Sequence, residues 1–141
     1  MSERIDRAAF LKRAGGLFAL ALFDPSSTWS HDREPLPHPD PRPGITADKV
    51  LKASELGDRP KKGVLSAYDA AREMPQVFDG LACGCGCTDH AGTHRSLLVC
   101  YESMQPTGCG SCREEADFVA KMARDGKTLA EIRTAVDKKF G

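Results

Sequence analysis

The sequence predicts a small all-α domain with cysteine-bearing loops and an antiparallel helical hairpin at its C-terminal end. Two observations carry this prediction. From residue 45 onward, apolar side chains recur at spacings of three and four, which is the period of a helix. No segment shows the strict alternation of apolar and polar residues that indicates a half-buried strand. The fold class expected from the sequence is therefore all-α.

The last helix has the clearest start. Thr128 and Glu131 form the pattern of a capping box, in which the two side chains satisfy backbone amides reciprocally. A single apolar stripe follows at spacings of three, four and four, made of Leu129, Ile132, Val136 and Phe140. The preceding helix is predicted from Cys112 to Arg124, and Gly126 suits a left-handed cap at its end. These two helices are expected to form the antiparallel hairpin.

The earlier helices are shorter. One is predicted from residue 46 to residue 55 or 56, before Gly57, and a second spans residues 64–74. Pro75 fits only the first turn of a helix, so it is expected to restart the chain in a new direction. A further helix is predicted from residue 90 or 93 to Met104.

The first thirty residues are typical of an export signal. Basic residues are followed at residues 14–23 by an apolar run whose length fits the core of a secretory signal, about 7–15 residues, and falls short of the roughly 20 of a membrane span. Residues 6–12 resemble a twin-arginine motif, but Ala8 stands where the second arginine belongs, so export by Tat or by Sec stays open. A short amphipathic helix in a cytosolic protein is the alternative. The expected location is extracytoplasmic, in the periplasm or cell envelope, with no transmembrane span.

Residues 31–44 are predicted to be a linker. Proline recurs at every second position from Pro35 to Pro43, and such a stretch favours extended polyproline II structure over packing. The cysteine-rich domain is then expected to span residues 45–141. The formal net charge of the chain is zero, so no basic face for nucleic acid is indicated.

The cysteines carry the chemistry. The chain has six, and all lie within residues 83–112. They form a Cys-Gly-Cys-Gly-Cys run, a single cysteine and a Cys-x-x-Cys pair, at positions Cys83, Cys85, Cys87, Cys100, Cys109 and Cys112.

A soft-metal site is the first interpretation of this cluster. Thiolates select Cu(I), Zn(II) or iron–sulfur clusters over hard cations, and glycines between cysteines allow a tight loop. The amides at the start of a helix would help to stabilise thiolates at Cys109 and Cys112. His94 is the first candidate for an added imidazole ligand, and His90 is the second. The predicted ligands are the six cysteines with these two histidines.

Two other interpretations stay open. Cys109-Gly110-Ser111-Cys112 resembles the active pairs of thiol–disulfide oxidoreductases, although the strand–helix–strand setting of thioredoxin is missing. Alternatively, six cysteines in an exported domain can form three structural disulfides. A disulfide within Cys-Gly-Cys would close a small and strained ring, which argues against that bond.

Several motifs together resemble one bacterial family. The cysteine run, the His94–Cys100 segment, the Cys109–Cys112 pair and the residues around Gly126 and Glu131 are similar to the PCYCGC-motif family, also called the CYCXC (seleno)protein family. The resemblance covers about residues 70–141, and the function of the family is unassigned. It implies export, often as a lipoprotein, and the selenocysteine of some members implies redox reactivity. This chain has Ala82 and Gly84 in place of the proline and tyrosine of the motif.

The sequence thus predicts an exported protein that binds Cu(I) or Zn(II) through clustered thiolates, for sequestration or delivery. An envelope metalloenzyme or a metal transporter is the expected partner. A binding role is favoured over an enzymatic one, and any enzymatic activity would be that of a thiol–disulfide oxidoreductase.

Overall fold

The computed structural model describes residues 35–58, 62–85 and 94–141, and all of these belong to one compact unit, residues 33–141. The predicted export signal, Cys87 and His90 lie outside the described residues. The described part contains six α-helices, one short 3-10 helix and no strand, so the all-α prediction is confirmed. None of its helices has the length and apolar character needed to cross a bilayer.

The first two α-helices meet at a proline. Helix α2 spans Val64–Glu73 and begins after Gly63, whose φ of 81° is in the left-handed region that glycine adopts freely. Helix α3 spans Pro75–Asp79, with the proline in its first turn as predicted. Val64, Ala67, Tyr68 and Ala71 of α2 are buried at helical spacing, which turns one face of α2 into the core.

The C-terminal helices follow the prediction closely. Helix α6 spans Gly110–Arg124, and α7 spans Leu129–Phe140 with the predicted capping box of Thr128 and Glu131. The two helices pack together, and the Phe118 and Phe140 rings meet edge to face at 5.7 Å between centroids. The antiparallel detail of this hairpin stays a prediction.

Two predicted helices differ from the structure. The stretch predicted as helix over residues 46–56 is a series of turns with only a 3-10 helix, η1, at Ala53–Glu55. The helix expected to run to Met104 is described only as α4, Leu97–Cys100. A short helix α5, Gln105–Gly108, was not predicted and has Pro106 in its first turn. Tertiary contacts are present in both regions: the Tyr101 side chain is buried in the core, and the Tyr101 carbonyl oxygen accepts a hydrogen bond from the Leu51 amide at 3.1 Å. These contacts compete with local helix propensity.

Tyr101 is at the centre of the packing. Its ring meets those of Tyr68 and Phe78 edge to face, at 5.0 and 5.8 Å between centroids. Its hydroxyl donates a hydrogen bond of 2.7 Å to the carbonyl oxygen of Cys112, so the polar end of this buried side chain is satisfied. The core is thereby linked to the first turn of α6, where the cysteines lie.

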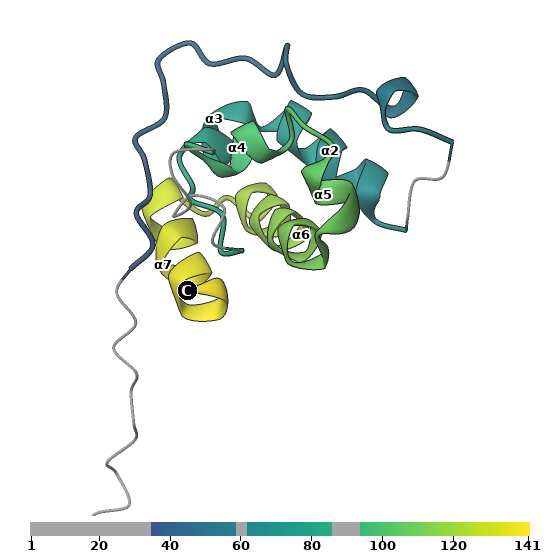
Figure 1. The fold of residues 1–141 in the computed structure, drawn as a ribbon. Helices are drawn as coiled ribbons and strands as arrows, with labels where there is room; N and C mark the ends of the chain where they lie inside the picture. Colours follow the sequence, from purple (N-terminus) through teal and green to yellow (C-terminus); the bar gives the residue numbers. More distant parts are fainter. Residues whose placement is uncertain (1–34, 59–61, 86–93) are drawn as a thin grey trace, which may run out of the picture. The chain divides into compact units, whose positions relative to one another are not determined.

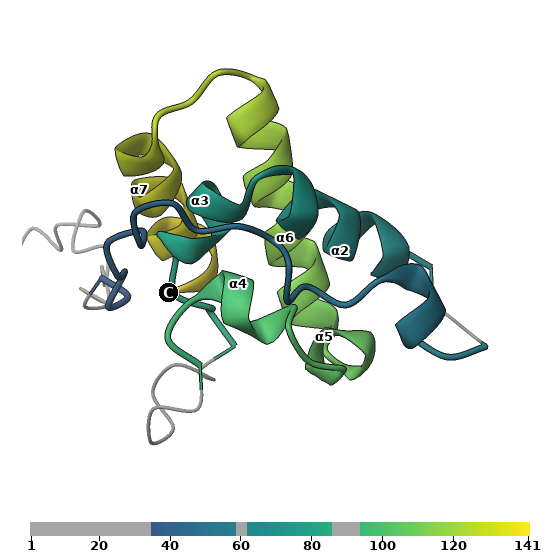
Figure 2. The ribbon, with the colours of Figure 1, turned by 90° about the horizontal axis from the view of Figure 1, so that it is seen from above.

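Residues 35–58, here called the N-terminal strap, run across the helices (Figures 1 and 2). The alternating prolines predict that the proline-rich part is extended and unpacked. Its described residues form neither helix nor strand, and the expectation that they do not pack is wrong. Leu36 lies against the core, and Arg42 reaches the buried Asp79. Alternating proline leaves side chains and carbonyls available for such contacts, as in the hydrogen bond from Arg133 to the carbonyl oxygen of Pro39. The domain boundaries themselves stay predictions.

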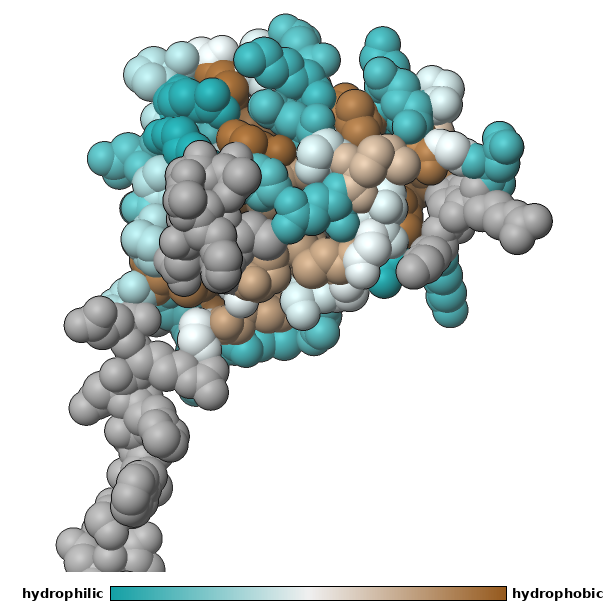
Figure 3. Space-filling view, in the orientation of Figure 1, coloured by the Kyte–Doolittle hydropathy of each residue, from teal (hydrophilic) through white to brown (hydrophobic). Residues whose placement is uncertain are grey.

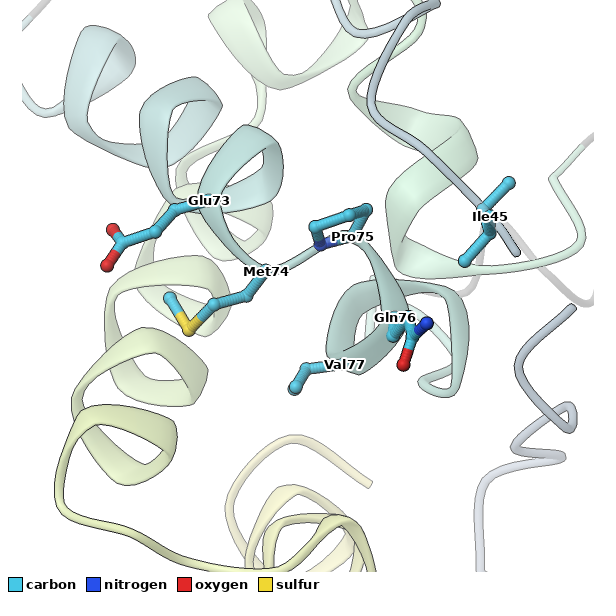
Figure 4. A pocket seen from close by; sticks show the side chains of 6 residues that line it. All are labelled: Ile45, Glu73, Met74, Pro75, Gln76 and Val77. Atoms are coloured by element: carbon cyan, nitrogen blue, oxygen red, sulfur yellow. The ribbon is translucent and has the colours of Figure 1, made fainter. Parts of the chain in front are cut away.

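One pocket among the described residues lies away from the cysteines. Hydrophobic and hydrophilic residues are interspersed on the face shown in Figure 3. A pocket of about 300 Å³ is lined by Ile45 and by residues 73–77, where α2 meets α3 (Figure 4). Glu73, its charged residue, is paired with Arg124 at 2.7 Å, and no cysteine or histidine lines it. The chemistry of the described residues is therefore concentrated at the cysteines.

Candidate metal and thiol site

Three cysteines from two parts of the chain meet at one point. The Sγ atoms of Cys83, Cys85 and Cys112 all lie within 4.8 Å of one another. The individual distances to Cys112 Sγ are 3.6 Å from Cys83 and 3.5 Å from Cys85, and the Cys83 and Cys85 sulfurs are 3.0 Å apart. Cys83 and Cys112 are buried, and Cys85 is half-buried. We call these three residues the cysteine triad.

Cys109 adjoins the triad through Cys112. It is the N-cap of α6, and its sulfur accepts a hydrogen bond from the Cys112 amide at 3.3 Å. The Cys109 and Cys112 sulfurs are 2.7 Å apart.

Cys100 contacts the triad through Cys83. Its sulfur is 3.3 Å from Nδ1 of His94, and it makes a hydrogen bond with Cys83. The pKa of Cys83 is lowered most by this hydrogen bond with Cys100, and next by the hydrogen bond with Cys112. The bond with Cys83, together with burial, raises the pKa of Cys112. Negative charge in the cluster is therefore favoured at Cys83, which is hydrogen-bonded to Cys85, Cys100 and Cys112.

Gly84 allows the loop between Cys83 and Cys85 to approach the C-terminal end of α7. A Cβ atom on Gly84 would lie 2.5 Å from Cβ of Phe140, a separation that two carbon atoms cannot adopt. The absence of a side chain at this position is therefore required by the packing. The tyrosine of the family motif could not occupy the same backbone position without moving Phe140.

Glu115 holds the loop between Cys83 and Cys85 through a hydrogen bond. It lies on α6, one turn after Cys112, and is completely buried. Its Oε2 accepts a hydrogen bond from the Gly84 amide at 2.8 Å, and Oε1 has no hydrogen-bond partner among the described residues. Burial, with added repulsion from negative charge at Cys83, raises the pKa of Glu115 to about 9. The carboxyl group is therefore neutral at pH 7.

The N-terminal strap also reaches the site. His38 accepts a hydrogen bond at Nδ1 from the amide of Ala82, the residue before Cys83, at 3.0 Å. Its Nε2 is 3.0 Å from Oδ1 of Asp137 on α7. The backbone at the start of the cysteine run is thus held by a side chain from residues predicted as linker. Neither His38 nor Glu115 was predicted from the sequence. His38 binds an amide 44 positions away along the chain, and Glu115 binds one 31 positions away. Nothing in the local pattern around either residue indicates such a contact.

The predicted ligands are thus only partly brought together. The structure joins Cys83, Cys85 and Cys112, places Cys109 against Cys112, and places Cys100 with His94 beside Cys83. Cys87 and His90 lie outside the described residues. No disulfide joins any two of the five described cysteines. The cysteine triad can hold a metal ion, and its sulfurs are also close enough to exchange disulfide bonds.

Comparisons with known proteins agree with the cysteine pattern. The family described as a protein of unknown function with a PCYCGC motif matches residues 46–141. No curated protein and no solved structure matches the chain. The match begins in the N-terminal strap and covers every helix described above. The chain therefore belongs to the family of proteins of unknown function with a PCYCGC motif, with Ala82 and Gly84 at the proline and tyrosine positions of that motif.

Proposed function

We propose that this protein binds one soft metal ion, Cu(I) or Zn(II), on the cysteine triad and sequesters or delivers it in the cell envelope. The observation that carries the proposal is the convergence of three sulfur atoms within 4.8 Å of one another. Two of these atoms come from one loop and the third from the first turn of α6, so the folded chain holds the ligands together.

The distances fit an ion of this kind. A zinc–sulfur bond of about 2.3 Å in a tetrahedral site places neighbouring sulfurs about 3.8 Å apart. The separations of 3.5 and 3.6 Å are close to this value, and the Cys83 and Cys85 sulfurs, 3.0 Å apart, need to separate by about 0.8 Å to reach it. Three sulfur ligands exclude a preference for hard cations such as Mg²⁺ or Ca²⁺.

The further ligands are part of the proposal. Cys100, which is hydrogen-bonded to Cys83, and His94 beside it could join a larger cluster, which the chain's other cysteine, Cys87, and His90 would extend. The export pattern of residues 1–30, together with the export that the family resemblance implies, supports a place in the periplasm or envelope. A metalloenzyme or transporter there is the proposed recipient.

Native mass spectrometry of the full chain, reduced and kept without oxygen, tests the proposal. We expect one Zn(II) or Cu(I) ion per chain. The Cys83→Ser variant should lose it, because the Cys83 sulfur lies within 3.6 Å of both other triad sulfurs, whereas Ser111→Ala, an exposed change in the same region, should keep it. A wild-type chain that binds neither ion above background, with its helical circular dichroism intact, would refute metal binding.

A second candidate function is thiol–disulfide exchange. It is favoured by the 2.7 Å between the sulfurs of Cys109 and Cys112 at the start of α6. In that case the isolated chain reduces a model disulfide without metal present, and Cys109→Ser abolishes the reaction. A third function, a disulfide-stapled interaction domain, requires bonds that the described cysteines do not form.

A further inference from the structure

Cys112 belongs to two arrangements that cannot exist at the same time. As a thiolate it completes the cysteine triad, with its sulfur 3.5 and 3.6 Å from the other two. The same sulfur is 2.7 Å from that of Cys109, and a disulfide between them needs only a further approach to about 2.05 Å. Because the thiolate is the metal ligand, a Cys112 engaged in that disulfide no longer serves the triad.

The exposure of the two sulfurs sets an order of reaction. Cys109 is half-buried and Cys112 is completely buried, so an external molecule reaches Cys109 first. Cys83, by contrast, is completely buried, and a bond from it to Cys85 would close the strained Cys-Gly-Cys ring.

We propose that the Cys109–Cys112 pair reduces disulfides, and that this reaction releases the metal ion from the cysteine triad. The proposal rests on the metal site proposed above and adds a second substrate class, a disulfide written R–S–S–R. It also makes metal binding depend on the redox state of one sulfur pair.

The chemistry balances in two steps. The Cys109 thiolate attacks one sulfur of R–S–S–R, forms a mixed disulfide and releases RS⁻. The Cys112 thiolate then attacks Cys109 Sγ, forms the Cys109–Cys112 bond and releases the second RS⁻. Two electrons pass from the pair to the external disulfide. The triad keeps two thiolates, and one metal ion leaves for each disulfide that is reduced.

The test uses the full chain loaded with one equivalent of Zn(II), which has no redox chemistry of its own. Oxidised glutathione is the added disulfide, and a chromophoric chelator reports the released zinc. We expect one zinc ion released for every two protein thiols lost, with mass spectrometry showing the new bond between Cys109 and Cys112. Excess dithiothreitol should restore zinc binding.

Cys109→Ser is the informative variant. It keeps the triad, so it should bind zinc, but release by glutathione should be at least tenfold slower than in wild type. Ser111→Ala, between the same two cysteines, should release zinc at the wild-type rate. Helical circular dichroism checks that both variants fold.

Three results would overturn the proposal. The first is a glutathione-treated wild-type chain that keeps its zinc while carrying the Cys109–Cys112 bond. The second is release that accompanies a Cys83–Cys85 bond instead. The third is a Cys109→Ser chain that cannot bind zinc, which would make Cys109 a ligand and leave the metal function standing. Failure of the initial zinc loading would instead refute the metal function itself, and this proposal with it.

Discussion

At the scale of single residues, the cysteine site depends on one side chain that is not a cysteine. Glu115 is completely buried, makes no ion pair among the described residues, and accepts a hydrogen bond from the Gly84 amide. It joins α6, which carries Cys112, to the loop that carries Cys83 and Cys85. Groups that orient metal ligands in this way commonly change metal affinity 10–100-fold when they are removed, in order-of-magnitude terms.

Replacing Glu115 tests this role. Glu115→Ala leaves the Gly84 amide without its acceptor and opens a cavity, so we expect a loss of about 1–3 kcal/mol in the free energy of unfolding. We also expect zinc affinity to fall roughly 10–100-fold. Glu115→Gln keeps an oxygen acceptor and should lose less than about 1 kcal/mol. Urea unfolding of the reduced, metal-free chain and a zinc competition titration measure both effects.

The control is Glu114→Ala, an exposed neighbour paired with Lys139, whose loss should be within about 0.5 kcal/mol. Equal losses for the alanine and glutamine variants of Glu115 would show that the Gly84 hydrogen bond is not what this residue provides.

At the scale of elements, the N-terminal strap is fastened to the helices by a buried carboxylate. Asp79 ends α3, and it accepts hydrogen bonds from Arg42 of the strap and from Ser96. Arg95 is a second ion-pair partner at 3.0 Å. Burial opposes ionisation, but the bonds from Arg42 and Ser96 outweigh it and hold the pKa of Asp79 at about 2, below its ordinary value of 3.8.

This lowered pKa predicts a loss of stability in acid. A carboxyl group with a depressed folded-state pKa contributes its stability above the unfolded value, and that contribution is lost as the pH falls through the folded value. We therefore expect wild type to lose about 1–2 kcal/mol between pH 4 and pH 2 through Asp79. Asp79→Asn should lack this pH-dependent loss and should be less stable than wild type at pH 7. Urea unfolding across the pH range measures both effects.

Asp69→Asn serves as the matched change, since that exposed carboxyl pairs with Arg72 within one helix. This variant should lose as much free energy of unfolding between pH 4 and pH 2 as wild type does. If Asp79→Asn kept the full acid-induced loss, the strap would not be held through this carboxylate.

At the scale of the whole molecule, metal binding and folding are expected to be coupled. The triad joins a loop before α4 to the first turn of α6. The core residue Tyr101 donates a hydrogen bond from its hydroxyl to the carbonyl oxygen of Cys112, one of the triad residues. The unfolded chain does not hold the three sulfurs together. Any ion that binds the folded chain alone therefore stabilises it by mass action.

This coupling predicts a melting temperature that depends on zinc. At a free zinc concentration one hundred times the dissociation constant, the folded state should gain about 2.7 kcal/mol. For a domain of this size that is a rise of roughly 10 °C in the midpoint of a calorimetric melt. Cys112→Ser should abolish the rise, and a chelator should reverse it in wild type. A midpoint indifferent to zinc would mean that the sulfurs hold no ion in the folded state.

The sequence by itself was sufficient for the features that are local. The start of α7 follows from Thr128 and Glu131, the break before α3 follows from Pro75, and the cysteine clustering is visible in the chain. Each of these depends on neighbours within a few residues, and the chemistry of capping, proline and thiolates needs no tertiary context.

Only the tertiary structure decided which sulfurs meet and what holds them. Cys83 and Cys112 are 29 positions apart, and His38 is 44 positions from the Ala82 amide that it binds. The short lengths of η1 and α4, and the packing of the proline-rich strap, likewise result from long-range contacts that override local propensity. The physical reason is that burial and side-chain hydrogen bonds act between residues distant in the chain, where spacing and periodicity carry no information.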